Sequence, residues 1–389
     1  MKKLWAILAL IVVLVAAWLG TAWHTGTRIE AESSAAIPLL NDAWSKNSSA
    51  AAPLPQIKQI SYQRGLLTSH ARYAVTYSAA QSAEPVAELD VAISHGPFPL
   101  TALQRGQLAP RQFDAHIELL TEGPLKTITG ALMNGKPPLV MDFGCSYGKY
   151  CAGTGNVPPI GLDLGPFSKN AKLAFGGIEM RFDIDIQTET DYKNNTDVKL
   201  LPLSIAGQDF GSGQLAASGD ATSAHEVFSW KTEKGESKLT LTLATSRPIP
   251  IGVNHPSFSP EDLPQLVKSG ALKAELSKPM LVDLTARVIS LTRGVALAAA
   301  QQQAQAQFDY MLANNPEVEK FIRADGDLLI SDWQYADGKL SVNNHERPEI
   351  LEQIKQTYLA GLHSLPNAVD APESASETKS APNKTGAGQ

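Results

Sequence analysis

Cysteine is scarce in this sequence, which holds only two among its 389 residues, Cys145 and Cys151. A structural zinc site needs four ligands, and neither a further cysteine pair nor a nearby histidine completes such a set around these two. They lie close together in CSYGKYC, with Gly148 inside the short loop. Outside the cytoplasm, an even pair so close in sequence predicts a local disulfide.

Blocks of basic residues are also missing. The chain has 33 Lys and Arg against 39 Asp and Glu, which gives a formal net charge of -6. A protein that binds nucleic acid gathers positive charge on one face or along one helix. The composition therefore argues against a nucleic-acid partner.

One long stretch lacks charge altogether. Residues 4–23, LWAILALIVVLVAAWLGTAW, follow directly after Lys2 and Lys3. At about 1.5 Å per residue this stretch spans about 30 Å, the thickness of the hydrocarbon core of a bilayer. Basic residues favour the cytoplasmic side, so residues 1–23 are predicted to be cytoplasmic lysines and a transmembrane signal anchor. The small residues at 20–22 leave a cleaved signal peptide as the alternative.

The remainder of the chain divides by composition. Residues 24–56 have few large apolar side chains and predict a stalk or linker with a short helical piece around 39–44. Residues 365–389 are rich in Pro, Ser, Ala and Lys and predict a disordered tail. Between them we expect a β-rich region, 57–257, and a helical region with a closing hairpin, 258–364.

Apolar and polar residues alternate along several stretches of the β-rich region. In FDIDIQT, Phe182 and Ile184 alternate with Asp183 and Asp185, and QFDAHIELL and KLTLTLAT repeat the pattern. Strict alternation is typical of half-buried strands with one apolar and one wet face. No helical segment separates these strands, so we predict a mainly β protein with α (α+β), built on an extended antiparallel sheet or open barrel.

Helical spacing dominates the last third of the chain. Ser259–Asp262 is a typical helix start and Gly270 a typical helix end, which together predict one helix. A longer helix is predicted over 284–313, and a short one after Asn315. The stretch DLLISDWQYADGKLSVNN then predicts a β-hairpin that turns at Asp337-Gly338.

The stretch SHGPFPL, residues 94–100, raises the question whether its histidine is catalytic or marks the end of a strand. Neighbouring residues on a strand point to opposite faces, so Ser94 and His95 cannot pair as nucleophile and base. Glycine permits a sharp change of direction and proline stops further pairing, so we interpret the motif as a structural corner, with its phenylalanine in the core. A ligand or proton-transfer role for the histidine remains the alternative. The motif consists of His95, Gly96, Pro97, Phe98 and Pro99.

Acidic and histidine side chains share one face of another predicted strand. Asp114, His116 and Glu118 could bind a metal there, but same-face neighbours lie about 6–7 Å apart, which is stretched for three ligands. A solvated polar face explains the same pattern. No metal-ligating, catalytic or cofactor-binding residue is therefore predicted.

Two further pairs of side chains have both a plain and a functional interpretation. Asp183 and Asp185 could be the paired acids of a glycosidase, although such acids must flank a cleft, and the sequence indicates none. Trp333 and Tyr335 share a strand face, where aromatic side chains form either core or a platform for sugars. We interpret both pairs as structural.

Five segments occur here in the same order as in one protein family. They are GTAWHTGTRIE, SYQRGLLTSHARYAV, SHGPFPLTAL, QDFGSGQL and WQYADGKLSVNN. Over about residues 1–345 the chain resembles the YdgA-like family of inner-membrane-anchored bacterial envelope proteins, a domain of unknown function. A more distant likeness is to AsmA-like proteins, which are linked to lipid homeostasis. One departure is Asn343-Asn344 where the pattern has Asn-Gly, and asparagine also tolerates positive φ.

The resemblance implies a place in the cell. It suggests a single pass through the bacterial inner membrane by residues 4–23, with the N-terminus cytoplasmic and the bulk of the chain periplasmic. It supplies no catalytic residues.

Together these observations lead us to expect a non-enzymatic, membrane-anchored periplasmic protein of the cell envelope, without a cofactor. It would bind lipid or a protein partner on an apolar sheet face, because such a face needs cover from helices, a ligand or a second copy. Two alternatives stay open. One is a periplasmic enzyme that acts on glycans or hydrolyses another substrate, and the other is a self-associating scaffold that forms a homodimer through its sheet edges.

Overall fold

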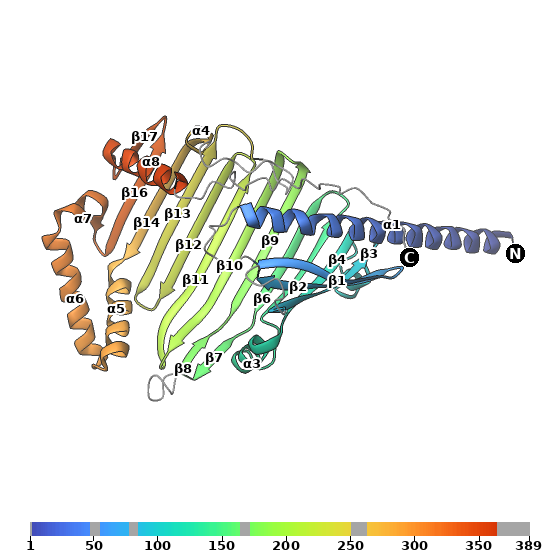
Figure 1. Ribbon diagram of the computed structural model, residues 1–389, viewed down its shortest axis with the longest axis horizontal. Coiled ribbons are helices and arrows are strands. Elements are labelled where there is room, and N and C mark those ends of the chain that lie inside the picture. Colours follow the sequence, from blue (N-terminus) through green and yellow to red (C-terminus); the bar gives the residue numbers. More distant parts are fainter. Residues whose placement is uncertain (1, 47–54, 78–84, 164–171, 250–262, 364–389) are drawn as a thin grey trace, which may run out of the picture.

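The computed structural model describes residues 2–46, 55–77, 85–163, 172–249 and 263–363, and in the first helix it describes the side chains of residues 13–42. It consists of a long N-terminal helix, one broad twisted sheet and a group of helices at the far end of the sheet (Figure 1). The predicted helix start at Ser259–Asp262 and the predicted tail at 365–389 lie outside the described residues.

Eighteen strands of the described residues form one open antiparallel sheet. Its first half is built from β1 (Pro55–Arg64), β2 (Thr68–Tyr77), β3 (Ala87–His95), β4 (Arg111–Thr121), β5 (Leu139–Ser146), β6 (Tyr150–Val157), β7 (Ile160–Asp163), β8 (Lys172–Phe175) and β9 (Ile178–Thr188). Its second half is built from β10 (Asp191–Ile205), β11 (Gln208–Asp220), β12 (Ser223–Thr232), β13 (Gly235–Thr245), β14 (Val267–Ser277), β15 (Arg323–Asp325), β16 (Leu328–Ala336), β17 (Lys339–Val342) and β18 (His345–Glu346).

The strands lie across the sheet almost in the order of the sequence. Each strand from β1 to β6 pairs with the next, β6 then pairs with β9, and the series continues from β9 to β14 and from β16 to β18. The hairpin β7–β8 pairs with the end of β10 beyond β9. The prediction of a mainly β protein with an extended antiparallel sheet is confirmed, and the sheet is open rather than closed into a barrel.

The sheet has two faces of opposite character. Because side chains alternate along each strand, residues in register across the sheet share a face. One row of registered residues is apolar from β3 to β13 and defines what we call the apolar face: Val91, Ile117, Met141, Met180, Val198, Leu215, Phe228 and Leu239. The opposite side, the polar face, presents His116, Asp142, Thr154, Arg181, Asp197 and Ala216 in neighbouring register positions.

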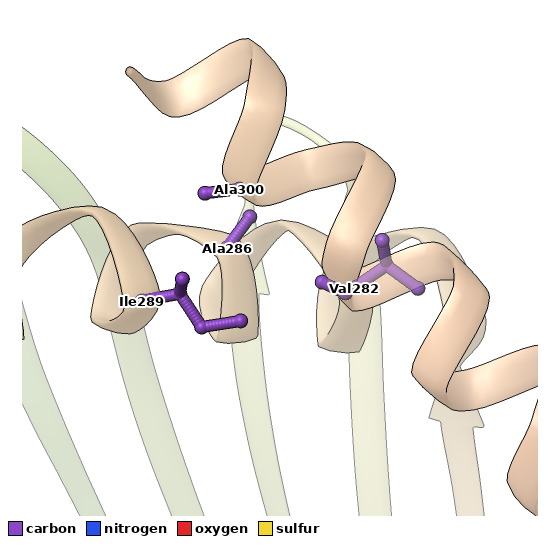
Figure 2. Packing of buried hydrophobic residues seen from close by; sticks show 5 residues of the cluster. Val282, Ala286, Ile289 and Ala300 are labelled. Atoms are coloured by element: carbon purple, nitrogen blue, oxygen red, sulfur yellow. The ribbon is translucent and has the colours of Figure 1, made fainter. Parts of the chain in front are cut away.

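Helices cover the apolar face near both ends of the sheet. Helix α1 (Lys2–Lys46) packs on β1 and β3, where Ile29 adds to a core of Ala71, Val91, Ile93 and Ala115. At the other end α5 (Lys278–Arg293) packs against β13 and β14 and against α6 (Leu297–Asn314). Figure 2 shows how Val282, Ala286 and Ile289 of α5 meet Ala300 of α6. Small alanine side chains let the two helix backbones approach closely.

The remaining helices are short or lie at the surface. They are α2 (Leu100–Gln104), α3 (Gly123–Leu132), α4 (Leu263–Leu266), α7 (Pro316–Phe321) and α8 (Pro348–His363). Helix α7 confirms the short helix predicted after Asn315. The predicted closing hairpin is β16–β17, and Asp337 and Gly338 have φ angles of 50° and 78°, as a two-residue turn requires. No helix in the described part of the chain is both long enough and apolar enough to cross a membrane.

Three helix predictions are corrected. The stalk expected from residue 24 is helical as far as Lys46, because its Ala-, Leu- and Glu-rich segment favours helix and docks on β1. The helix expected to end at Gly270 is wrong beyond α4, since residues from Val267 onward form β14 between β13 and β16. The single helix expected over 284–313 is two helices, because Gly294, with a φ of 68°, ends α5 in the left-handed conformation.

Candidate functional site

Within the part of the chain that the structure describes, no helix covers the apolar face between α1 and α5. On β13 and β14, Leu239, Leu241 and Leu272 are 41%, 39% and 36% exposed, and Leu241 and Leu272 are register partners. Under α1, by contrast, Val91 and Ile93 of the same face are buried. Apolar and polar residues alternate along β13, which puts its leucines on one face. Neither α1 nor α5 covers these leucines, so they stay exposed.

The open stretch continues across neighbouring strands. Met180, Phe182, Val198, Leu215 and Phe228 lie on the apolar face of β9 to β12, and each keeps part of its side chain accessible to solvent. Adjacent strands lie about 4.8 Å apart, so the distance from β9 to β14 is roughly 24 Å. The hydrocarbon core of a bilayer is about 30 Å thick, and an acyl chain spans one of its two leaflets. An acyl chain therefore fits across these strands. An exposed apolar strip of this kind marks a binding surface.

Two hollows of the sheet lie on its polar face. One, of about 660 Å³, spans β10 to β16 and includes Lys193, Asp220, His225 and Gln334. Another, of about 770 Å³, lies over β2 to β5 beside α2, and we call it the polar groove. The polar groove brings histidines and acids together, which the sequence pattern did not indicate because these residues come from three strands, β2, β4 and β5. They are His70, Asp114, His116 and Asp142.

The acids and His116 in the polar groove already interact with neighbouring side chains. Asp114 is only 3% exposed and accepts hydrogen bonds from Arg105 and Thr101. His116 lies 2.9 Å from Asp142 through Nδ1 and 3.3 Å from Glu118 through Nε2. The hydrogen bond to the Asp142 carboxylate, followed by that to Glu118, raises the pKa of His116 despite partial burial. Both ring nitrogens of His116 already face carboxylates, so the geometry favours a structural network over a general base.

The expected metal candidates are divided between different partners. Asp114 faces the two arginines at 105 and 111, whereas His116 lies between the carboxylates of Glu118 and Asp142. Within the described residues, no group of three or more His, Cys, Asp or Glu side chains is placed to hold a metal ion.

His95 lies at the contact between α1 and the sheet and is 1% exposed. Its Nδ1 lies 2.9 Å from the carbonyl oxygen of Ala22, and its Nε2 lies 3.1 Å from Ser69 Oγ. A carbonyl only accepts, so Nδ1 carries the proton and the Ser69 hydroxyl donates to Nε2. Burial lowers the pKa of His95, which favours this neutral form.

Two glycines make this contact possible. A Cβ on Gly26 would lie 2.5 Å from Cε1 of His95, and a Cβ on Gly96 would lie 2.7 Å from Cβ of Ala22. Gly96 also has a φ of 116°, which side chains rarely adopt. The motif at 95–99 therefore fits helix α1 against the end of β3.

The core position expected for Phe98 is wrong, since this side chain is 39% exposed. The fully buried side chains of that segment are His95 and Pro99. Gly96 turns the chain by its positive φ, and the following residues lead into α2 beside the polar groove.

Arg64 at the end of β1 holds the neighbouring turn of α1. Its guanidinium lies 5.2 Å from the ring centroid of Trp23, donates to Thr27 Oγ1 at 2.6 Å, and lies 3.3 Å from Glu30. Further along the helix, the Asn41 side chain donates to the Ile57 carbonyl and accepts from the Ile57 N–H. These contacts fix α1 along β1.

The two cysteines face each other on β5 and β6. Their sulfur atoms lie 2.08 Å apart, at disulfide distance, and the residues are register partners. The pattern Gly-x-Ser-x-Gly also occurs here, at residues 144–148. In hydrolases this pattern lies on a turn from strand to helix, whereas Ser146 ends a strand in a tight β-turn and accepts from the Tyr150 N–H at 3.2 Å. Ser146 therefore lacks the strand-to-helix turn that presents a nucleophilic serine in hydrolases.

The other expected pairs lie in ordinary surroundings. Asp183 accepts from Asn195 and Asp185 accepts from Gln187, both on the polar face. Trp333 stacks on Phe321 with ring centroids 5.8 Å apart, which covers one side of its ring.

Comparison with known proteins shows the family. The model of a family described as "Bacterial protein of unknown function (DUF945)" matches residues 1–227 and 224–349. The chain belongs to this family. It is 26% identical to an uncharacterized protein of Haemophilus influenzae over 147 residues and 25% identical to Protein YdgA of Escherichia coli over 191 residues. These matches cover 38% and 48% of this chain and 40% and 36% of the two relatives.

The matched part of this chain thus spans less than half the length of these relatives. No solved structure matches the chain.

Proposed function

We propose that this protein is a non-enzymatic, membrane-anchored component of the bacterial cell envelope that binds lipid acyl chains on its open apolar face. The observation that supports this function is the strip of half-exposed apolar side chains from β9 to β14, with Leu239, Leu241 and Leu272 more than one third exposed. Apolar surface of this extent is stabilised when a ligand removes it from water.

An anchor in the inner membrane supports the choice of lipid over other apolar ligands. The uncharged run at residues 4–23 is long enough for a single pass, and the preceding lysines favour a cytoplasmic N-terminus. The rest of the chain would then be periplasmic. Helix α1 lies on the apolar face, so lipid that leaves the bilayer along α1 meets the same face of the sheet.

A hydrolytic enzyme is the second candidate, because the polar groove gathers histidines and acids. Its support is weaker. Asp114 and Asp142 already have cationic partners, and His116 is flanked by two carboxylates.

The test uses a photo-cross-linking amino acid in the full chain, expressed in living bacteria. Leu241 is replaced on the apolar face, and Thr242, its neighbour on β13 that points to the polar face, is replaced as the matched control. We expect lipid-mass adducts at position 241, detected by mass spectrometry, and few at 242. Equal labelling at both positions, or none, contradicts the proposal. Cross-links to another protein would indicate a partner-binding face, and cross-links between copies would indicate the self-associating scaffold.

A further inference from the structure

One end of the sheet gathers exposed apolar side chains on three successive turns. Leu66, in the turn from β1 to β2, is 48% exposed. Leu103 and Leu108, between β3 and β4, are 36% and 74% exposed. Tyr147 and Tyr150, at the turn from β5 to β6, are 46% and 45% exposed. The strand register places these turns together, because Arg64 pairs with Ser69, Thr68 with Ser94, His95 with Phe113, and Arg111 with Ser146. We call them the apolar edge.

The apolar edge lies beside the part of α1 where the uncharged run ends. Ala22 of α1 accepts the hydrogen bond of His95 and abuts Gly96, the residue that opens the connection carrying Leu103 and Leu108. Arg64, which precedes the turn of Leu66, stacks over Trp23. Helix α1 continues without interruption toward residue 2, so no spacer separates the uncharged run from this edge (Figure 1).

The direction of α1 along the sheet determines which end faces the membrane. Residues 22–27 contact the ends of β1 and β3 at this edge, whereas Asn41 contacts Ile57 near the start of β1. The helix therefore runs from the apolar edge toward the opposite end of the sheet. Its contacts with His95, Arg64 and Ile57 hold that direction, so the edge has a defined position relative to the anchor.

We infer that the apolar edge is a second membrane contact, in which the exposed side chains at its turns enter the headgroup region of the bilayer beside the anchor. This inference rests on the proposed anchor at residues 4–23. Tyrosine and tryptophan favour the level of the headgroups, and leucines on an interfacial segment lie deeper, in the acyl boundary. Arg105, the residue after α2, lies at the same edge, but its guanidinium pairs with Asp114 and Asp142, so the contact rests on the apolar side chains.

The inference deepens the proposed function. With the edge on the bilayer, the apolar face begins at the membrane surface, and lipid can reach it without crossing water. The opposite end of the sheet, with α3, would point away from the membrane.

Depth-dependent quenching of a fluorophore tests this arrangement in the full chain. A bimane label is placed on Leu108→Cys, on Ile128→Cys, and on Leu14→Cys, each with the Cys145–Cys151 pair left oxidised. Ile128 is the matched control, since it is an apolar residue, 53% exposed, on α3 beyond the opposite end of β4. Leu14 reports on the anchor. The proteins are reconstituted in vesicles of phosphatidylethanolamine and phosphatidylglycerol that contain nitroxide-labelled lipid.

We expect quenching at Leu14 and Leu108, with Leu108 quenched about twofold or more over Ile128, because interfacial side chains lie roughly 5–10 Å into the headgroup and acyl boundary. Quenching at Leu14 with none at Leu108, or equal quenching at Leu108 and Ile128, overturns the inference and leaves the anchor in place. No quenching at Leu14 overturns the anchor, and the inference falls with it.

Discussion

At the scale of the residue, one buried histidine links the N-terminal helix to the sheet. His95 uses both ring nitrogens, toward Ala22 and Ser69, and burial favours its neutral form, in which the Ser69 hydroxyl donates to Nε2. A buried cation would lose hydration near Arg64, whose charge also lowers the pKa of His95. The contact between α1 and the sheet should therefore weaken in acid.

The expected pH dependence follows from the lowered pKa of His95 in the folded protein. An unfolded histidine has a pKa of about 6.5, so the stability that depends on neutral His95 is complete above that pH. As the pH falls below about 6.5, protons bind the unfolded chain first and this stability is lost. Between pH 7.5 and 5.5 the loss is at most about 1.4 kcal/mol, because it is limited by titration of the unfolded histidine.

Urea unfolding of the full chain in detergent at the two pH values measures this effect. The His95→Gln variant should lose less stability than the original protein over the same interval. His116, whose pKa is raised, acts in the opposite direction and is common to both proteins. An equal loss in both proteins would show that His95 does not titrate between the two states.

At the scale of the element, α1 meets His95 of the sheet through a glycine. Gly26 leaves room for the imidazole of His95, and a Cβ there would lie 2.5 Å from Cε1. In most helices the change from glycine to alanine stabilises by about 0.5–1 kcal/mol. At position 26 the same change should instead destabilise the protein.

We predict that Gly26→Ala lowers the free energy of unfolding by about 1–3 kcal/mol, since His95 or α1 must shift. Gly130→Ala in α3 is the matched control, because a Cβ there meets nothing within 4 Å. It should leave stability unchanged or raise it by up to about 1 kcal/mol. Chemical denaturation of both variants in detergent gives the comparison. A gain at both positions would contradict the packing of α1 on His95.

At the scale of the whole molecule, the described helices cover one face of a wide sheet near its two ends. Helix α1 covers β1 and β3, α5 lies against β13 and β14, and the leucines at 239, 241 and 272 stay accessible. A ligand that binds this strip in the folded chain, and not in the unfolded chain, raises stability by mass action.

We therefore expect added phosphatidylglycerol to raise the thermal midpoint of the detergent-solubilised full chain. At 100 times the dissociation constant the gain is about 2.7 kcal/mol. Leu241→Asp, which places a charge on the apolar face, should reduce the gain, and Thr242→Asp on the polar face should preserve it. If both variants respond to lipid as the original protein does, the stabilisation arises elsewhere than at the apolar face.

Much of the fold was predictable from local patterns. The alternation in FDIDIQT and KLTLTLAT specified strands with two unlike faces, and Asp337-Gly338 specified the closing hairpin. Val267–Ser277 was not predictable in this way, because its strand conformation depends on pairing with β13 and β16, far away in sequence. The same limit applied to the polar groove, whose charged residues meet only after β2, β3, β4 and β5 have paired.

Side-chain type and spacing along the chain were enough to specify the strands, their two faces and the uncharged N-terminal run. Three features depended on tertiary packing: the sheet stays open, His95 receives α1 through Gly26, and no helix of the described residues covers the middle of the apolar face. Those features depend on which surfaces meet across long sequence separations. Local periodicity shows that a face is apolar, but only packing determines what covers it.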